Sequence, residues 1–218
     1  MTKVRDYPSP STQNKMESTE RKILKLFTYE KKLKFNELEK SLKIRSNKLA
    51  YHVKSMVNKK ILVKSGEHYS LSEGSEYLIP YISEKVSVLP VVLIAMKRGR
   101  RVFLVERNKR PFKGKLALPA SRLLLGESIE EGTKRILREK YGVNGSLERI
   151  NSVSIEHVKK NGRTMHSFLL ILVSAKTDDK IEYLDIEDVK KRIIKSDYLL
   201  MKHNLGKKID IGTFYSTD

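Results

Sequence analysis

Acidic and basic side chains with the spacing of a metal or phosphate site are concentrated in residues 116–143. Ile136, Glu139 and Lys140 are three and four residues apart, so on a helix they share one face. Carboxylates on such a face can bind a divalent cation such as Mg²⁺, which holds phosphate oxygens and activates water. Only one of these three residues is a carboxylate. Even with Glu127 added, the set is a poor magnesium site, because Mg²⁺ demands octahedral oxygen coordination.

The flanking residues predict a loop followed by a helix. Ser128 and Glu131 have the spacing of a capping box, in which each side chain bonds to the other residue's backbone amide. Gly142 suits the left-handed turn that would end the helix after Tyr141. We therefore predict a helix of about 13 residues, a common length, beginning after Ser128.

This stretch resembles the signature of the Nudix family, G-x5-E-x7-R-E-U-x-E-E-x-G-U, where U is a bulky aliphatic residue. The positions that match it are Glu127, Arg135, Leu137, Glu139, Gly142 and Val143. Ser121 replaces the first glycine, Ile136 the first helical glutamate and Lys140 the last one. In the family the helical glutamates bind the divalent cations. The resemblance therefore implies an impaired site with no catalytic residues and no metal, in which only Glu127, Arg135 and Glu139 remain.

The replacements favour binding of a ligand over hydrolysis. The Lys140 ammonium could take the electrostatic role of the metal, holding a nucleotide or another small molecule that contains a diphosphate. The predicted ligand-binding residues are Arg107, Arg110, Lys115, Arg122, Glu139 and Lys140. Two structural alternatives remain open. Lys140 could point to solvent, where the helix dipole favours a cation, and Glu127 could pair with Arg135 to brace the loop.

Composition limits the possible partners. The chain has 218 residues, of which 39% are hydrophobic, enough for one large or two small globular domains. No apolar run approaches the length of a membrane span and no signal peptide is evident, so we expect a cytoplasmic protein without a membrane partner. The absence of cysteine excludes disulfides, thiolate metal sites and cysteine nucleophiles.

A net charge of +19 favours anionic partners, either nucleic acid or phosphorylated metabolites. Both parts of the chain are basic. Residues 1–86 contain 18 Lys and Arg against 10 Asp and Glu, and the remaining residues contain 27 against 16. A lysine-rich solvated surface would give the same excess, so charge alone does not choose between these partners.

The N-terminal third has the pattern of a small helical domain. Residues 1–14, which are rich in Pro, Ser and Thr, predict a disordered tail. Apolar residues at helical spacing predict three helices, the first near residues 23–27, the second over 35–42 and the third from Ser46 to about Lys60. Two short strands, 61–64 and 68–71, then predict a hairpin with a turn at Ser65 and Gly66, and a return helix follows over 72–79.

That order, with the string Leu49-Ala-Tyr-His-Val-Lys-Ser-Met-Val-Asn-Lys-Lys-Ile-Leu-Val63, resembles the winged helix-turn-helix regulators of archaea and bacteria. The resemblance assigns residues 15–85 to a winged helix whose third helix enters the major groove of double-stranded DNA. The predicted DNA-binding residues are Arg45, Ser46, Asn47, Lys48, Tyr51, His52, Lys54 and Lys64. Arg45 and Asn47 suit base edges, and the lysines suit phosphates. A winged helix that binds a protein partner is the alternative.

Residues 86–218 change to strand patterns. Residues 86–96 and 101–106 predict a hairpin, 147–155 and 166–173 predict further strands, the latter central, and 184–195 predict a closing helix with Asp185 as N-cap. Around the box helix, this order resembles the Nudix α/β/α sandwich. The predicted fold class is therefore α+β. It consists of an N-terminal winged helix, with three helices and a hairpin wing, followed by a Nudix-like sandwich with a mixed sheet.

These features predict a sequence-specific DNA-binding transcription regulator, archaeal in type, whose impaired Nudix-like domain senses a phosphorylated ligand or mediates dimerisation. We expect a homodimer, because two half-sites are needed for adequate specificity. The main alternative is a Mg²⁺-dependent Nudix hydrolase of nucleoside diphosphate derivatives with an auxiliary DNA-binding domain. In that case Glu130, Glu131 or Glu156 would supply the missing carboxylate, and Mg²⁺ would be the only cofactor.

Two further alternatives remain. One is a DNA-binding protein whose Nudix-like half is only a dimerisation scaffold. The other is an RNA-binding or general nucleoid protein with little sequence preference and a steep dependence of binding on salt.

Overall fold

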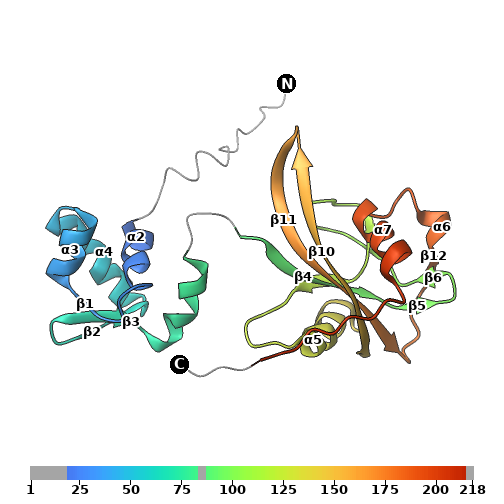
Figure 1. The fold of residues 1–218 in the computed structure, drawn as a ribbon, viewed down its shortest axis with the longest axis horizontal. Coiled ribbons are helices and arrows are strands. Elements are labelled where there is room, and N and C mark those ends of the chain that lie inside the picture. Colours follow the sequence, from blue (N-terminus) through green and yellow to red (C-terminus); the bar gives the residue numbers. More distant parts are fainter. Residues whose placement is uncertain (1–18, 83–86, 215–218) are drawn as a thin grey trace. The chain divides into compact units, whose positions relative to one another are not determined.

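The computed structural model describes residues 19–82 and 87–214, and the contacts divide the chain into two units, Met1–Val86 and Ser87–Asp218. Each unit is described by itself (Figure 1). The tail predicted over residues 1–14 lies outside the described residues.

In residues 19–82, the N-terminal unit contains three α-helices, a small sheet and a 3₁₀ helix. Its elements are α2 (Thr19–Leu26), β1 (Leu33–Lys34), α3 (Phe35–Leu42), α4 (Ser46–Asn58), β2 (Leu62–Ser65), β3 (His68–Leu71) and η1 (Glu73–Tyr81). The sheet is antiparallel in the order β1-β3-β2. The three predicted α-helices and the hairpin are confirmed. β1 was missed, because two residues are too few to show an alternating pattern.

The core of this unit is formed where one face of each helix meets the sheet. It comprises Ile23, Phe27, Leu33, Leu38, Leu49, Val53, Met56, Leu62 and Leu71. The predicted return helix is present as the 3₁₀ helix η1, which contains Pro80. Proline cannot donate a backbone hydrogen bond, so it does not favour a regular α-helix at this position.

The C-terminal unit is built on a four-stranded sheet in the order β10-β11-β4-β9. The strands are β4 (Leu89–Ala95), β9 (Ala120–Arg122), β10 (Gly145–Lys160) and β11 (Arg163–Thr177). β11 pairs antiparallel with β10 and parallel with β4, and β4 pairs antiparallel with β9. The sheet is therefore mixed and β11 is interior, as predicted.

Shorter strands complete the unit: β5 (Lys97–Arg98), β6 (Arg101–Val102), β7 (Val105–Glu106), β8 (Leu116–Ala117) and β12 (Leu184–Asp185). The hairpin predicted between residues 86–96 and 101–106 is present only near its turn, where β5 pairs with β6 and the Phe103 amide donates to the Met96 carbonyl at 3.1 Å. It is wrong in extent, because β4 lies between β11 and β9. The second predicted strand is also split into β6 and β7. Phe103 and Leu104, at the split, pack into different cores.

A helix covers each face of the main sheet (Figure 1). On one face, α5 (Ile129–Tyr141) packs Ile136 and Leu137 against Val92 and Ile94. On the other, α7 (Lys195–Asn204) contributes residues to the cluster that contains Leu93 and Leu172. This alternation follows from the two-residue period of side chains along a strand.

The closing helix predicted over residues 184–195 is wrong in extent. Asp185 does cap a helix, but α6 (Ile186–Val189) is short, and the longer α7 begins at Lys195. Between them the backbone pairs with β8, since Leu116 donates to the Arg192 carbonyl at 3.0 Å and accepts from the Ile194 amide at 2.9 Å. This tertiary pairing overrides the helical pattern of the sequence.

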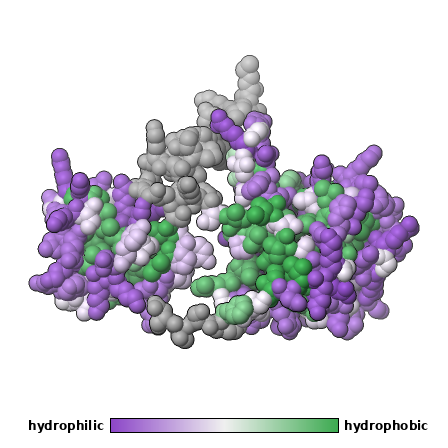
Figure 2. Space-filling model, viewed as in Figure 1, coloured by the Kyte–Doolittle hydropathy of each residue, from purple (hydrophilic) through white to green (hydrophobic). Residues whose placement is uncertain are grey.

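Hydrophilic side chains cover most of each unit in the view of Figure 2. On the C-terminal unit, hydrophobic side chains also reach the surface over β4 and the β10–β11 pair. Val153 and Ile155 of β10 are 41% and 61% exposed. Within the described ranges, no helix is long and apolar enough to cross a lipid bilayer.

Candidate functional site

The loop and helix predicted from the box sequence are confirmed. The Glu131 amide donates a hydrogen bond to the Ser128 hydroxyl at 3.2 Å, and the Ser128 amide donates one to the Glu131 carboxylate at 2.8 Å. Gly142 ends α5 with a φ of 64°, in the left-handed region. The two ends of the helix are therefore defined by local backbone chemistry, and its polar residues keep stable positions along it.

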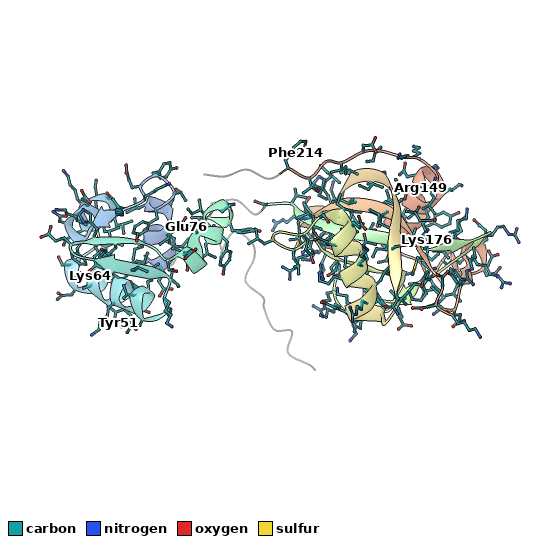
Figure 3. The ribbon with its side chains drawn as sticks, turned by 90° about the horizontal axis from the view of Figure 1, so that it is seen from below. Tyr51, Lys64, Glu76, Arg149, Lys176 and Phe214 are labelled. Atoms are coloured by element: carbon teal, nitrogen blue, oxygen red, sulfur yellow. The ribbon has the colours of Figure 1, made fainter. Side chains whose placement is uncertain are left out.

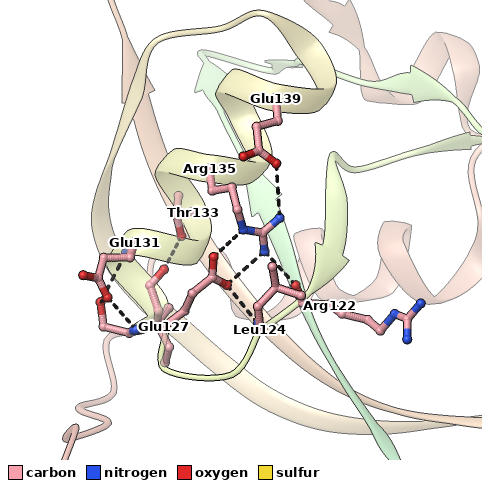
Figure 4. Close-up of polar contacts among 9 residues, drawn as sticks. Arg122, Leu124, Glu127, Glu131, Thr133, Arg135 and Glu139 are labelled. Atoms are coloured by element: carbon pink, nitrogen blue, oxygen red, sulfur yellow. Dashed lines mark hydrogen bonds and ion pairs between the residues drawn. The ribbon is translucent and has the colours of Figure 1, made fainter. Parts of the chain in front are cut away.

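Glu127 and Arg135 form the ion pair that braces the loop (Figure 4). A guanidinium N–H of Arg135 donates to Glu127 Oε2 at 2.9 Å, and the Leu124 amide donates to the same oxygen at 2.9 Å. Arg135 Nε donates to Glu127 Oε1. The hydrogen bond from Arg135 is the main cause that lowers the pKa of the Glu127 carboxyl. The structural reading of this pair is confirmed, and both carboxylate oxygens are occupied.

The three residues on the box face have different surroundings. Ile136 is fully buried in the core between α5 and the sheet. The Glu139 side chain is 63% exposed and lies 3.9 Å from a guanidinium nitrogen of Arg135. Lys140 turns its ammonium back towards β9, where Nζ donates to the Ala120 carbonyl at 3.2 Å. Lys140 therefore does not simply extend from the helix end into solvent.

Burial and the charges of four cations act on the Lys140 ammonium. Burial is the first cause of its lowered pKa, and the charges of Lys109, Arg135, Arg107 and Arg122 follow. We call these four residues and Lys140 the Lys140 cluster. Repulsion of this kind would be relieved by an anion.

The predicted ligand-binding residues fall into two groups, those whose charges act on Lys140 and those that are placed elsewhere. Arg107 and Arg122 are among the charges that most lower the pKa of Lys140, whereas Lys115 and Arg110 are not. Lys115 Nζ instead donates to the Lys191 carbonyl at 3.1 Å. Arg110 is exposed, and its carbonyl accepts a guanidinium N–H of Arg107 at 3.3 Å.

Sequence reasoning missed Lys109, although it lies in the same basic loop as Arg107. The concentration of four cations in residues 107–113 was the available signal.

A cavity of about 390 Å³ lies between β10 and α7. Its lining includes Glu156, Ser196, Leu200 and His203. Beside Ser196 is Asp197, which is 4% exposed and accepts the Leu118 amide at 2.9 Å. Burial is the main cause that raises the pKa of Asp197 to about 7; the Leu118 hydrogen bond and the Arg107 charge oppose this shift, and the Glu156 charge adds to it. Sequence reasoning missed Asp197, because its burial depends on how α7 packs.

Arg107 connects the Lys140 cluster to this acidic region electrostatically. Its charge acts on Lys140 and also on Asp197.

The carboxylates that could complete a magnesium site are engaged elsewhere. Glu130 pairs with Lys134 at 2.8 Å, Glu131 caps α5, and Glu156 lines the cavity against α7. Across the described ranges, no group of three His, Asp or Glu side chains is arranged to hold a metal ion. The Mg²⁺ that the box signature implies does not fit this donor set.

In the N-terminal unit, the predicted DNA-binding residues lie on α4 and on the β2–β3 hairpin. All but one are exposed, namely Arg45, Ser46, Asn47, Lys48, Tyr51, Lys54 and Lys64. Tyr51 is 72% exposed, and Figure 3 shows it and Lys64 at the edge of the unit. His52 is half-buried, and its Nδ1 has no hydrogen-bond partner among the described residues.

Opposite the exposed residues, α4 buries Leu49, Val53 and Met56. Its 13 residues include no Asp or Glu. The helix thus presents a polar, cationic face on an apolar base, which is a surface suited to a polyanion.

Comparison with known proteins identifies one domain. The family model described as "NUDIX domain" matches residues 87–197. Among curated proteins, none matches the chain.

Several solved structures are similar to the chain. A NUDIX hydrolase from Nitrosomonas europaea is 19% identical with a TM-score of 0.47, and the match covers 59% of this chain and 98% of that one. The mutator MutT protein from Bacillus halodurans is 17% identical with a TM-score of 0.41, covering 53% and 81%. Shewanella oneidensis NrtR is 17% identical with a TM-score of 0.41, covering 52% and 60%.

Proposed function

We propose, from the premise that this chain belongs to the Nudix family, that it is a DNA-binding regulator whose Nudix domain binds a phosphorylated small ligand. The observation that supports the proposal most strongly is that two features occur in the same chain. An exposed cationic helix face in one unit accompanies a box site in the other unit that is rich in cations and poor in carboxylates.

The DNA-binding part rests on α4 and the hairpin after it. The element order and the core are those expected for a winged helix, in which α4 would enter the major groove and β2–β3 would form the wing. Arg45 and Asn47, at the N-terminal end of α4, would face base edges. Lys48, Lys54 and the wing residue Lys64 would contact phosphates.

The ligand-binding part rests on the Lys140 cluster. Its cations are held near one another by the fold at an energetic cost, because like charges repel. A diphosphate group would remove this cost and gain charge-assisted hydrogen bonds.

We further propose that the regulator acts as a homodimer, since a winged helix gains specificity from two half-sites. Because its DNA target would lie in the cytoplasm, we place the protein there. Binding of the ligand would alter DNA affinity by favouring one state of the dimer.

The test is selection of genomic fragments by the full chain at near-physiological salt, with nonspecific competitor DNA, with and without a panel of nucleoside diphosphate compounds. We expect enrichment of a discrete sequence that a panel compound shifts. The variant Asn47→Ala should lose the enrichment, because Asn47 would face base edges, whereas the control Lys134→Ala, on the exposed face of α5, should retain it. Fragments bound without sequence preference and with a steep salt dependence would contradict the proposal and favour a nucleoid protein.

A Mg²⁺-dependent hydrolase is the second candidate, favoured by family membership and by the exposed carboxylate of Glu139. It requires magnesium-dependent consumption of a panel compound, abolished by Glu139→Gln. No turnover with any panel compound, together with binding of one of them, would exclude this candidate for that panel.

A further inference from the structure

The Ala120 carbonyl, which Lys140 contacts, is held in position from several sides. Ala120 belongs to β9 and pairs with Leu93 of β4. Its amide donates to the Tyr141 hydroxyl at 3.4 Å, and its carbonyl accepts Lys140 Nζ at 3.2 Å. Two successive residues at the end of α5 therefore hold Ala120 of β9, Tyr141 through its amide and Lys140 through its carbonyl.

The identity of residue 140 determines whether the Ala120 carbonyl needs a metal cation beside it. Carbonyl and carboxylate oxygens are the ligands that hard cations prefer. A glutamate at position 140 would place a negative group towards the carbonyl oxygen, and a cation would be needed between them. The Lys140 ammonium satisfies the carbonyl directly and brings its own positive charge, so it needs no metal.

The rest of the box cannot replace the lost carboxylates. Both oxygens of Glu127 accept hydrogen bonds from Arg135. Ile136 is fully buried and offers no oxygen ligand. Glu139 is the one box carboxylate that stays exposed, and Arg135 lies beside it. A single exposed carboxylate cannot meet the octahedral coordination that Mg²⁺ demands.

We propose that the Nudix site of this protein binds phosphoryl oxygens directly on the Lys140 cluster, with the Lys140 ammonium in place of the divalent metal. The proposal deepens the proposed function and rests on it. The ligand class is a diphosphate or a comparable phosphorylated anion. Since an ammonium does not generate hydroxide from bound water as a metal does, the ligand is held without being hydrolysed.

The charge balance of the cluster agrees with this ligand class. Arg135 forms an ion pair with Glu127. The other cations whose charges act on Lys140 are Arg107, Lys109 and Arg122. The positive charge of these neighbours lowers the pKa of Lys140, and a bound anion would oppose that effect. A diphosphate carries enough negative charge to offset most of the group.

The test measures binding of inorganic pyrophosphate and of ADP to the full chain by calorimetry, once in EDTA and once in Mg²⁺. We expect both probes to bind in EDTA, and we expect Mg²⁺, which complexes both probes in solution, to strengthen the binding of neither. Lys140→Met should weaken binding by about tenfold or more in EDTA, because a charge-assisted contact is lost. The matched control is Arg138→Met, which removes an exposed cation of the same helix that is not among the main causes of the Lys140 pKa shift. It should bind within about twofold of the unchanged protein.

A second variant tests the replacement in the opposite direction. Lys140→Glu should lose pyrophosphate binding in EDTA and regain part of it when Mg²⁺ is added. The same variant should bind Mn²⁺ more tightly than the unchanged protein, as read from the electron paramagnetic resonance signal of free Mn²⁺. Equal and weak Mn²⁺ binding by both proteins would count against the exchange of ammonium for metal.

The outcomes separate this inference from the function on which it rests. If the unchanged protein binds either probe only with Mg²⁺, the metal-free site is wrong while ligand binding stands. If neither probe binds in EDTA or in Mg²⁺, the proposed phosphate site itself fails. Thermal melts of each variant identify any loss of binding that comes from unfolding.

Discussion

The helices α4 and α5 have the same length, 13 residues, but use their polar faces differently. On α5, Lys134 pairs with Glu130, Arg135 pairs with Glu127, and Lys140 bonds to a carbonyl of β9. On α4, Lys48 and Lys54 are exposed, and neither forms an ion pair within the described part of the chain.

The difference separates two uses of positive charge in a strongly basic chain. Charges on α5 organise their own unit, and removing one leaves a local partner unsatisfied. Charges on α4 contribute little to folding, since exposed charges without close partners are worth little, so they remain available for an external anion. Stability measurements and binding measurements should therefore respond to different residues.

The largest effect should come from a buried acid of the C-terminal unit, Asp197. Its folded-state pKa of about 7 lies above the model-compound value of 3.8, so the folded state binds the proton more tightly. Its contribution to the free energy of unfolding is then fully present below pH 4 and is lost as the pH rises through 7. The loss is on the order of 4 kcal/mol at about 1.4 kcal/mol per unit.

Urea denaturation of the full chain and of Asp197→Asn at pH 5 and pH 8 measures this effect. Asparagine can still accept the Leu118 amide, so the variant isolates the titration. We expect the variant to gain stability relative to the unchanged protein as the pH rises. Parallel pH profiles for the two proteins would show that Asp197 stays ionised in the folded state.

The next effect concerns the brace between Glu127 and Arg135. Both side chains are less than one-fifth exposed, so Arg135→Met should reduce the free energy of unfolding by about 1–3 kcal/mol. Because Arg135 lowers the pKa of Glu127, the stability from this pair is present at neutral pH. It is lost as the pH falls below the normal range of a glutamate.

The contribution of the ion pair to the free energy of unfolding is measured by thermal and urea denaturation of Arg135→Met, Glu127→Gln and the double variant. The double variant should cost less than the sum of the single ones, because neither charge is then left alone. The α4 variant Lys54→Ala should cost less than about 0.5 kcal/mol. Equal losses in the free energy of unfolding for the α4 and α5 variants would mean that the two helices use their charges in the same way.

A smaller free-energy change should appear when the α4 cations are tested in DNA binding. Lys48→Ala and Lys54→Ala should each weaken binding about tenfold and reduce the slope of log affinity against log salt by about one. Fluorescence anisotropy across a salt series measures both quantities. An unchanged slope in both variants would mean that α4 does not contact phosphates.

The sequence predicted the local features of the site and missed those created by tertiary packing. Ser128, Glu131 and Gly142 act within one or two helical turns, so their roles could be read from spacing alone. The brace between Glu127 and Arg135 was predicted for the same reason. The burial of Asp197 and the turn of Lys140 towards Ala120 depend on segments distant in sequence.

The fold shows the same division. The predicted mixed sheet and the interior position of β11 followed from long apolar runs, whose length is a strong signal. The extent of the hairpin and the extent of the closing helix were wrong, because β4 pairs with β11 and the backbone around Ile193 pairs with β8. Pairings between distant segments leave no local pattern in one sequence.

The smallest effect concerns how the two helices begin. Ser128 caps α5 through its hydroxyl, whereas Arg45 is the N-cap of α4 and makes no side-chain cap. Ser128→Ala should therefore cost about 1 kcal/mol in unfolding, and Arg45→Ala should cost less than about 0.5 kcal/mol. An N-cap position that is occupied by arginine gains no stability from it, so the side chain is free to serve another purpose. Arg45→Ala should weaken DNA binding while leaving the melting temperature almost unchanged. A cost of 1 kcal/mol or more in unfolding for Arg45→Ala would instead assign the residue to the fold, and α4 would then resemble α5.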